Sequence, residues 1–340
     1  MLSPAITVII VNLNGERYLR DCLGSLASQT FGDFEVIVVD NGSTDGSLDL
    51  ICNGFPWVRI ICLACNTGFA KGNNTGFAAS SSRYMVTMNN DTIADSGWLN
   101  ALFEAAESDP LVGMVASKIY LGREGKELDS AGMLIYPDGM SRQRGRGETD
   151  SGQFDSIGEV LFPSACAALY RSEMLKAIGY FDEDFFSYCE DADLGLRARL
   201  AGWKAVFAPR AIVRHLYSQT GGQYSAFKAY HIERNRFWVL IKDLPLSFIL
   251  LFPVYTIWRY IVQIYGLITG RGSVARFAEG SGSLSLIGVV LKAWGGSIAG
   301  LSEALKKRKR IWSSRQLAAR EYKNLLNMNT ITAAELMLRD

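Results

Sequence analysis

Polar side chains that could do chemistry gather in three short clusters, each directly after an apolar run. Asn12–Asn14 follow the run ITVIIV, Asp40–Gly42 follow FEVIVV, and Asn89–Asp91 follow YMVTM. Their side-chain amides and carboxylates can hold a ligand by hydrogen bonds. Asn, Asp and Gly occur in turns for backbone reasons alone, so a turn would explain any one cluster. Three clusters at successive run ends indicate a ligand site.

An acidic pair, Glu190 and Asp191, marks a second place where chemistry is expected. Residues 191–200 have the spacing of a helix that ends near Gly202, so the pair lies at the start of that helix. The helix dipole stabilises carboxylates there, and simple capping would explain the pair. A carboxylate held beside a substrate hydroxyl can instead take its proton as a general base. Asp193 lies on another face of the same helix and is the weaker candidate.

Four strands are expected to position the three clusters. ITVIIVNL and FEVIVVD are apolar, β-branched runs typical of parallel strands covered on both faces, and VRIICL and YMVTMN supply a third and a fourth strand. Helical stretches separate them, such as the amphipathic residues 18–28. The alternation predicts an α/β fold with right-handed crossovers and a doubly wound sheet. Ligands bind such sheets at the carboxyl ends of the strands, where all three clusters fall.

The overall composition excludes some classes of protein. A net charge of +1 with 20% charged residues argues against a general nucleic-acid binder. The six cysteines are scattered, and only Cys62 and Cys65 form a C-x-x-C pair without the further ligands of a zinc site, so we expect reduced thiols of a cytosolic protein. No basic region precedes the apolar run at residues 6–11, which is therefore expected to be a first strand and not a signal peptide.

The C-terminal third differs in composition from the rest of the chain. Residues 222–243 predict an amphipathic helix, and residues 244–269 and 284–301 are strongly apolar, with the basic run KKRKR at 306–310. Residues 242–320 contain twelve basic and three acidic residues, a net charge of +9. This charge asymmetry indicates a region with an interaction partner of its own.

Residues 244–269 have three open interpretations. A spanning helix needs about twenty apolar residues, and the segment is long enough, but Pro245, Pro253 and Arg259 count against spanning. A helix that lies in the membrane interface fits better, because aromatic anchors and a basic cluster attract anionic headgroups. A buried core or an oligomer surface is the third interpretation.

Six motifs, taken together and in order, resemble glycosyltransferase family 2, the inverting enzymes with the GT-A fold. The closer resemblance is to the rhamnosyltransferase-like branch that builds bacterial surface polysaccharides. It covers residues 6–240, and the last hundred residues match only in general character. The matching stretches are VIIVNLNG (8–15), VVDNGSTDGS (38–47), NTGFAKGNNTGF (66–77), MNNDT (88–92), GYFDEDFFSYCEDADLGLRARLAGW (179–203) and HIERNRF (231–237).

The resemblance implies a fold and a division of the chain. The fold is an α/β, GT-A type, Rossmann-like and mostly parallel sheet flanked by helices, followed by a helical C-terminal region at the membrane interface. The glycosyltransferase domain is expected at residues 1–240, with a nucleotide-binding half at 1–110 and an acceptor half at 111–240. A basic and aromatic helical region is expected at 241–340.

The same resemblance implies roles for individual residues. Asp191 would be the general base of an inverting transfer, with Glu190 tuning it. Asp91 and His215 would hold a divalent metal, Mg²⁺ or Mn²⁺, that offsets the charge of the departing nucleoside diphosphate. A purely structural role stays open for His215, Lys71 and Arg234. The residues assigned to the nucleotide-sugar donor are Asn12, Asn14, Asp40, Asn41, Asn66, Gly68, Lys71, Asn74, Asn90 and Arg234.

The expected substrates follow from the resemblance too. They are a UDP-, dTDP- or GDP-sugar, with dTDP-rhamnose favoured, and a saccharide or polyprenyl-linked acceptor. The expected location is the cytoplasm, peripheral on the inner membrane, with an anionic membrane surface as partner and a homo-oligomer left open.

Three rival functions predict other sequences. A sugar nucleotidyltransferase would carry a Gly-rich phosphate loop where this chain has NLNGERY. A non-catalytic nucleotide-sugar-binding subunit would be favoured if Asp91 or Asp191 were replaced, and both are present. A channel-forming synthase would need several clean spanning helices.

Overall fold

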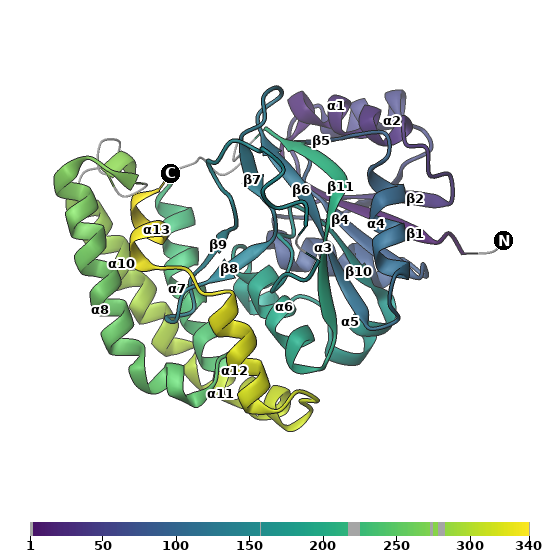
Figure 1. Cartoon of the computed structure of the whole chain (residues 1–340). Coiled ribbons are helices and arrows are strands. Elements are labelled where there is room, and N and C mark those ends of the chain that lie inside the picture. Colours follow the sequence, from purple (N-terminus) through teal and green to yellow (C-terminus); the bar gives the residue numbers. More distant parts are fainter. Residues whose placement is uncertain (1–2, 157, 217–224, 273–274, 278–282, 340) are drawn as a thin grey trace.

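The computed structural model describes residues 3–339 except 157, 217–224, 273–274 and 278–282. Sheet and helices alternate in the first half of the chain, and helices alone follow β11 (Figure 1). The strands are β1 Ile6–Asn12, β2 Phe34–Asp40, β3 Arg59–Cys62, β4 Tyr84–Met88, β5 Thr92–Ala94, β6 Val112–Leu121, β7 Leu128–Ser130, β8 Met133–Ile135, β9 Ser141–Gln143, β10 Ala167–Arg171 and β11 Lys204–His215. The α-helices are α1 Glu16–Ala27, α2 Ser47–Gly54, α3 Gly68–Ala79, α4 Trp98–Glu107, α5 Ser172–Ile178, α6 Glu190–Leu200, α7 Ala226–Asp243, α8 Leu246–Thr269, α10 Ser283–Ala299, α11 Leu301–Ser313, α12 Ala319–Met328 and α13 Ala333–Leu338.

The central sheet has the order β3-β2-β1-β4-β10-β6-β11-β5, with β7 paired to β6. The first four strands are parallel, as the sequence predicts, and so are β6 and β11. The sheet is not mostly parallel beyond β4, because β10 pairs antiparallel with both β4 and β6 and β5 pairs antiparallel with β11. A parallel neighbour would need a crossover connection, and the chain between β6 and β10 forms short strands and turns instead.

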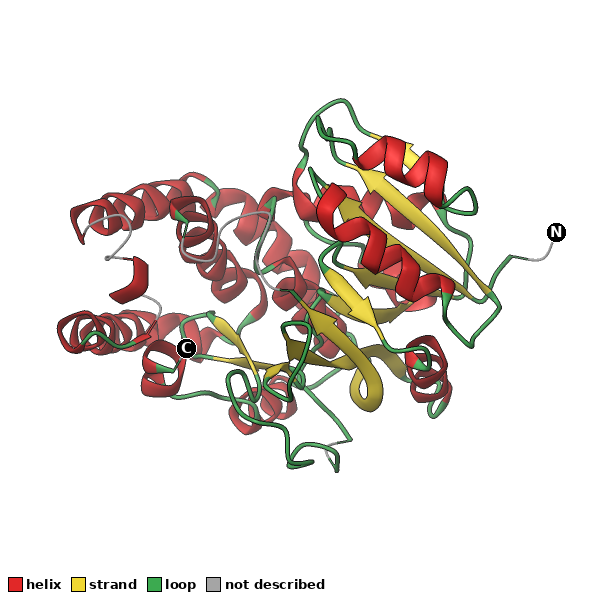
Figure 2. Ribbon diagram, turned by 90° about the horizontal axis from the view of Figure 1, so that it is seen from above, coloured by secondary structure: helices red, strands yellow, loops and turns green. Residues whose placement is uncertain are grey.

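Helices cover both faces of the sheet, which explains why its strands are continuous apolar runs (Figure 2). On one face, α1, α2 and α4 pack on alternate residues of β1 and β2, including Ile6, Val8 and Val36. On the other face, α3, α5 and α6 pack on the intervening residues, including Ile9 and Ile37. The small-residue face of α3 serves this packing, since a Cβ at Gly72 or Gly76 would lie 2.7 or 2.5 Å from the side chains of Val11 or Ile9.

The C-terminal helices pack against the sheet domain and share its core. Trp238 of α7, Ala304 of α11 and Tyr322 of α12 belong to the same buried cluster as Ile9 of β1. The predicted helix at 222–243 is confirmed from Ala226 to Asp243, and residues 222–224 lie outside the described residues.

Helix α8 differs from the expectation for residues 244–269. Pro253 lies inside a continuous 24-residue helix and does not end it. Arg259 is 1% exposed and points into the protein, where its guanidinium binds Asp138 at 2.7 Å and Glu233 at 3.1 Å. The arginine therefore does not interrupt the outer face of the helix.

The basic run at 306–310 is also partly structural. Lys307 forms ion pairs with Asp182 and Asp184, and Arg308 donates to the carbonyls of Ile241 and Leu244. Only part of this run is left exposed to attract a partner.

Candidate active site

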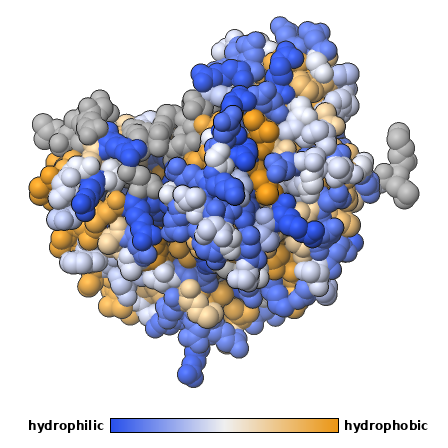
Figure 3. Space-filling view, turned by 45° about the horizontal axis from the view of Figure 1, so that its top comes forward, coloured by the Kyte–Doolittle hydropathy of each residue, from blue (hydrophilic) through white to orange (hydrophobic). Residues whose placement is uncertain are grey.

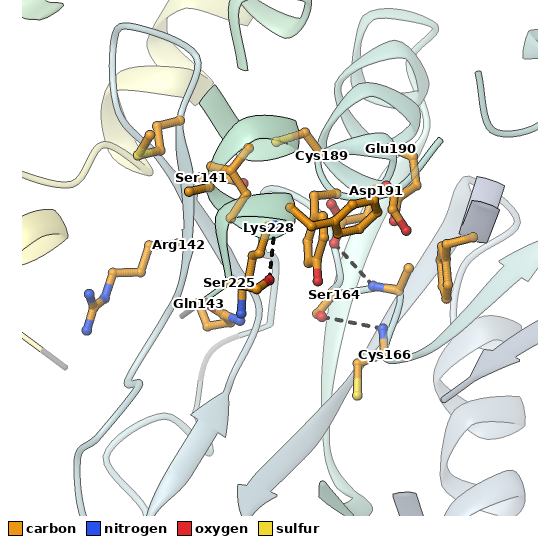
Figure 4. Close-up of a pocket in the computed structure, with 18 of the residues that line it drawn as sticks. Ser141, Arg142, Gln143, Ser164, Cys166, Cys189, Glu190, Asp191, Ser225 and Lys228 are labelled. Atoms are coloured by element: carbon orange, nitrogen blue, oxygen red, sulfur yellow. Dashed lines mark hydrogen bonds between the residues drawn. The ribbon is translucent and has the colours of Figure 1, made fainter. Parts of the chain in front are cut away.

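A cavity of about 790 Å³ opens at the carboxyl ends of the strands, the position that the polar clusters predict. The ends of β1, β2, β4 and β11 form one wall, and α6 and the β8–β9 hairpin form others. Figure 4 shows Glu190 and Asp191 on one side of this space and Ser141, Arg142 and Gln143 on another. The volume is in the range of small-molecule sites in proteins.

Asp91 and His215 lie next to each other on the wall of the cavity. Their facing atoms, Asp91 Oδ1 and His215 Nε2, are 3.3 Å apart. On the other side of the imidazole, Nδ1 lies 2.8 Å from Asp129 Oδ2. Such a carboxylate fixes the ring so that Nδ1 carries the proton and Nε2 is turned toward Asp91, as second-sphere carboxylates do in metal sites.

The charges around His215 oppose the effect of burial on its pKa. Burial disfavours the imidazolium, but Cys166, Asp129 and Asp91 together raise the pKa of His215 well above its usual range. For Asp129, burial would raise the pKa, yet the hydrogen bond and charge of His215 and the charge of Arg146 outweigh it and lower that pKa. The carboxylates of Asp91 and Asp129 are thus balanced by the imidazolium of His215 and by Arg146, and a metal bound at His215 Nε2 would replace the proton on that nitrogen.

The acidic pair begins α6, as the sequence predicts. Asp191 is partly buried, and its two carboxylate oxygens accept hydrogen bonds from the backbone N–H groups of Ala165, at 3.3 Å, and Ala192, at 2.8 Å. Glu190 is 6% exposed, and its Oε2 has no hydrogen-bond partner within the described part of the chain.

The pKa of each carboxyl group in the pair is raised. Burial raises the pKa of Glu190 to about 8, and the neighbouring charge of Asp191 adds to this effect. Burial also raises the pKa of Asp191, although the amides of Ala165 and Ala192 partly offset it. Two adjacent carboxyls with different partners are a pattern that separates acid and base roles.

Asp193 has a structural role. Its side chain is fully buried, and it forms ion pairs with Arg197, at 2.9 Å, and with Lys242. It does not line the cavity formed by the described residues. The choice of Asp191 over Asp193 agrees with this geometry.

Four of the residues assigned to the donor line the cavity: Asn41, Asn66, Gly68 and Asn90. Asn41 organises this wall, because its Nδ2 donates to Asn66 Oδ1 and to the carbonyl of Gly68, each at 3.1 Å. Its Oδ1 accepts from the backbone N–H of Thr67 at 2.9 Å. The amide side chain thereby holds the entry to α3 against the end of β2.

Six other donor-assigned residues lie outside the set of described residues that line the cavity: Asn12, Asn14, Asp40, Lys71, Asn74 and Arg234. Asn12 and Asp40 are buried, and Asn12 Nδ2 donates a hydrogen bond to Asp40 Oδ1 at 3.2 Å. Asn14 forms hydrogen bonds with Ser43 and Thr44 in the turn after β2. They support the wall from behind, since Asn90 Nδ2 donates to Asn12 Oδ1 at 2.8 Å.

The remaining three make contacts within the protein. Lys71 pairs with Glu183 at 3.9 Å, and Asn74 donates to Glu183 at 3.1 Å. Arg234 donates to the carbonyls of Asp184 and Phe185 at 3.0 and 2.9 Å. Their assignment to the donor stays a prediction.

Some residues of the site are absent from the sequence-based assignment. Asp129, whose carboxylate contacts His215 Nδ1, lies in the three-residue strand β7, and its local sequence does not indicate the histidine as a partner. The β8–β9 hairpin contributes Ser141, Arg142 and Gln143 to the cavity, and its short strands give no periodic signal in the sequence.

The fold is α/β, and its cavity at the carboxyl ends of the strands brings carboxylates and a histidine together. The chain belongs to glycosyl transferase family 2, whose family model matches residues 7–179. It is a glycosyltransferase.

Two relatives have recorded activities. The chain is 26% identical over 252 residues to the N-acetylglucosaminyl-diphospho-decaprenol L-rhamnosyltransferase of Mycobacterium tuberculosis, a match over 65% of this chain and 79% of that protein. It is 24% identical over 274 residues to the poly-beta-1,6-N-acetyl-D-glucosamine synthase of Staphylococcus epidermidis, a match over 76% of this chain and 64% of that protein.

Two solved structures share the fold. GalNAc-T7 with UDP, GalNAc and Mn²⁺ superposes with a TM-score of 0.55 at 15% identity, covering 68% of this chain and 47% of that one. Staphylococcus aureus TarS superposes with a TM-score of 0.51 at 17% identity, covering 88% of this chain and 55% of that one. The GT-A fold predicted from the sequence is confirmed.

Proposed function

We propose that the chain is an inverting glycosyltransferase that moves a sugar from a nucleoside-diphosphate sugar to a saccharide or lipid-linked saccharide in bacterial surface polysaccharide synthesis. The observation that carries this proposal is that two pairs of functional side chains line one cavity. Asp91 with His215, and Asp191 with Glu190, come from segments far apart in the chain and line the same space.

Asp191 is the proposed general base. Inversion requires a carboxylate on the acceptor side of the anomeric carbon, where it takes the acceptor proton as the hydroxyl oxygen attacks. The backbone hydrogen bonds from Ala165 and Ala192 hold the Asp191 carboxylate in place. Glu190, whose raised pKa keeps it largely protonated near neutral pH, leaves Asp191 as the single negative charge of the pair.

Asp91 and His215 Nε2 are the proposed ligands of a divalent metal. No group of three or more His, Cys, Asp and Glu side chains arranged to hold a metal occurs in the described ranges of the chain. A carboxylate and an imidazole still fit, because Mg²⁺ and Mn²⁺ sites of this kind complete their coordination with water and substrate phosphates. The metal would supply positive charge opposite the departing diphosphate.

The donor nucleotide is proposed to lie against Asn41, Asn66, Gly68 and Asn90, which line the cavity beside Asp91. A rhamnose donor is favoured by the likeness to the mycobacterial rhamnosyltransferase.

A lipid-linked acceptor is consistent with the apolar part of the same cavity, which extends to Ile232, Phe277 and Met337. We further propose that residues 1–240 carry the chemistry and 241–340 the contact with the acceptor's membrane. The shared core makes this a division of roles between parts that fold together.

A donor and metal screen tests the proposed function. Purified protein is incubated with UDP-, dTDP- or GDP-sugars, with a polyprenyl-diphosphate-linked saccharide as acceptor and with Mn²⁺, Mg²⁺ or a chelator. We expect transfer from one nucleotide class, dTDP-rhamnose being favoured, and loss of transfer on chelation. Nucleotide binding without turnover for every donor would support a non-catalytic binding subunit, and formation of a nucleotide sugar from sugar phosphate would support a nucleotidyltransferase.

The proposed membrane contact is the outer face of α8. Within the described residues, one helix is long and apolar enough to cross a membrane, and it is α8. Its exposed side carries large apolar residues, among them Leu250, Val254, Ile257, Trp258, Ile261, Ile264 and Ile268, each at least 51% exposed. Hydrophobic residues gather on the side of the molecule where α8 lies, at the left of Figure 3.

An interfacial position fits this helix better than a spanning one. The buried residues of α8 extend along most of its length, from Phe248 to Gly266, and two of them, Thr256 and Arg259, contact Asp138. A spanning α8 would carry that body, with its charged surface, into the hydrocarbon. An exposed apolar face of this length marks an interaction site. A lipid surface would bury this face without the need for a second protein.

Liposome flotation tests this contact. We expect the protein to float with vesicles that contain phosphatidylglycerol and to float less as salt screens the exposed lysines and arginines. The double variant Ile257→Glu, Ile261→Glu should stay at the bottom of the gradient with an unchanged melting temperature, because both side chains are exposed. Leu111→Glu is the matched control, since Leu111 is 51% exposed on the sheet domain.

Two outcomes would contradict the membrane contact. One is failure of the unaltered protein to float at low salt. The other is a dimer in solution that dissociates in the double variant, which would assign the face to a second copy of the chain.

A further inference from the structure

The turn at residues 186–189, which leads into Glu190 and Asp191, has an unfavourable backbone conformation. Phe186, Tyr188 and Cys189 have φ angles of 63°, 71° and 66°, in the left-handed region that residues with a β-carbon rarely adopt. Such conformations persist only where the surroundings hold them. The turn also lines the cavity, so the groups that hold it help to set where α6 and Asp191 begin.

Asn235 of α7 holds this turn from behind. Its side chain is 0% exposed, and its Nδ2 lies 2.9, 2.9 and 2.7 Å from the carbonyl oxygens of Phe185, Ser187 and Tyr188. Arg234 Nε donates to Asn235 Oδ1 at 2.8 Å, which fixes the orientation of the amide so that its N–H groups face the turn.

The other side of the turn contacts the start of α3. The carbonyl of Phe186 accepts a hydrogen bond from Ala70 N–H at 3.2 Å. Gly68, with φ of +87°, approaches the same carbonyl so closely that an added Cβ would lie 2.4 Å from it. The turn is therefore held between the donor-side wall and α7.

We propose that Asn235 is a positioning residue for glycosyl transfer: its amide fixes the turn before α6 so that Asp191 faces the acceptor hydroxyl. The inference rests on the proposed function of Asp191 as base. Asn235 itself is outside the set of described residues that line the cavity, so it acts through the turn and not by touching substrate.

The test is Asn235→Asp. This variant keeps the size of the side chain and the oxygen that faces Arg234, but it replaces the N–H donors with an oxygen that repels three carbonyls. Misplacement of a catalytic group by about 1 Å can cost roughly 10²-fold, so we expect kcat to fall by about that factor while the KM for the donor changes little. Amide hydrogen exchange of residues 185–191 should become faster than in the unaltered protein.

Asn73→Asp is the matched control. Asn73 is 1% exposed on α3, and its Nδ2 donates to one carbonyl of its own helix, that of Phe69, at 2.9 Å. We expect this variant to lose a comparable buried hydrogen bond while kcat and the exchange of residues 185–191 stay near normal. A merely structural role for Asn235 would give the two variants the same pattern.

Two results would overturn the inference: unchanged exchange of residues 185–191 in Asn235→Asp, or an unchanged kcat. If Asn235→Asp does not fold, Asn235→Ser, which keeps one donor, undergoes the same two measurements. The exchange measurement needs no turnover. An unaltered protein that transfers no sugar therefore refutes the proposed function, whereas normal exchange in the variant refutes the role of Asn235.

Discussion

Replacement of Asp191 by Asn should lower kcat by roughly 10²- to 10⁴-fold, the usual contribution of a general base. Asn has the shape of Asp and its oxygen can still accept from one of the two backbone amides, of Ala165 or Ala192, so the fold should persist. It cannot take the acceptor proton at neutral pH. Donor nucleotide and metal binding should survive, because Asp91 and the Asn41 wall are untouched.

Three quantities are measured for the variant: the initial rate of sugar transfer, the affinity for the donor nucleotide by calorimetry, and the melting temperature. Normal binding and melting with a collapsed kcat would place the loss in the chemical step. An Asp191→Asn variant that transfers sugar at the normal rate would show that another group is the base.

Glu190→Gln is the matched control for this experiment. Because the pKa of Glu190 is raised to about 8, its side chain is mostly neutral at pH 7, and Gln imitates that form. We expect transfer near pH 7 within several-fold of normal. The acid limb of the rate profile should follow ionisation of Asp191, with the rate rising with pH at values above the ordinary aspartate range.

Stability should change with pH in a direction that follows from the Glu190 pKa. Between its ordinary value of 4.5 and about 8, the unfolded chain has lost this proton while the folded protein retains it. The folded state then binds more protons than the unfolded state, so this group makes stability fall as pH rises through that window. Glu190→Gln has no proton to lose and should lack that part of the fall in melting temperature.

The positions of the proposed catalytic groups were partly predictable because they follow regular elements. Asn90 and Asp91 come after a buried strand, and the strand-end rule places them at the cavity. Asp191 begins a helix, and the acidic first turn alone does not separate a base from a cap. The family resemblance and the different helix face of Asp193 favoured Asp191, and the structure adds that Asp193 is held in buried ion pairs with Arg197 and Lys242.

What the sequence does not show concerns side chains whose partners lie far away in the chain. Arg259 counted against a spanning helix, but a single sequence does not show that Asp138, 121 residues earlier, binds it inside the protein. Asp129 comes from a three-residue strand in an irregular segment, where no periodicity indicates direction. Such pairings depend on tertiary packing, which local patterns do not contain.

Replacement of Asp91 by Asn should remove the metal-dependent part of the reaction. The neutral amide is a poor ligand for Mg²⁺ or Mn²⁺, and a metal beside a departing diphosphate stabilises the transition state by several kcal/mol. That corresponds to a fall in kcat/KM of roughly 10³-fold or more. Asp91 is 4% exposed and pairs with His215 Nε2 at 3.3 Å, so the melting temperature of the variant is measured alongside its activity.

Asp129→Asn separates a ligand from the group that orients one. Asp129 contacts His215 Nδ1 at 2.8 Å and not Nε2, so its loss should weaken metal affinity by about 10- to 100-fold without removing a ligand. Excess Mn²⁺ should then restore transfer in Asp129→Asn and fail to restore it in Asp91→Asn, as measured by rate against metal concentration. Equal rescue of both variants would mean that neither carboxylate binds the metal directly. Full activity of Asp91→Asn in the presence of a chelator would mean that protein groups alone stabilise the leaving diphosphate. The basic side chains of the cavity wall would then be the next candidates for that role.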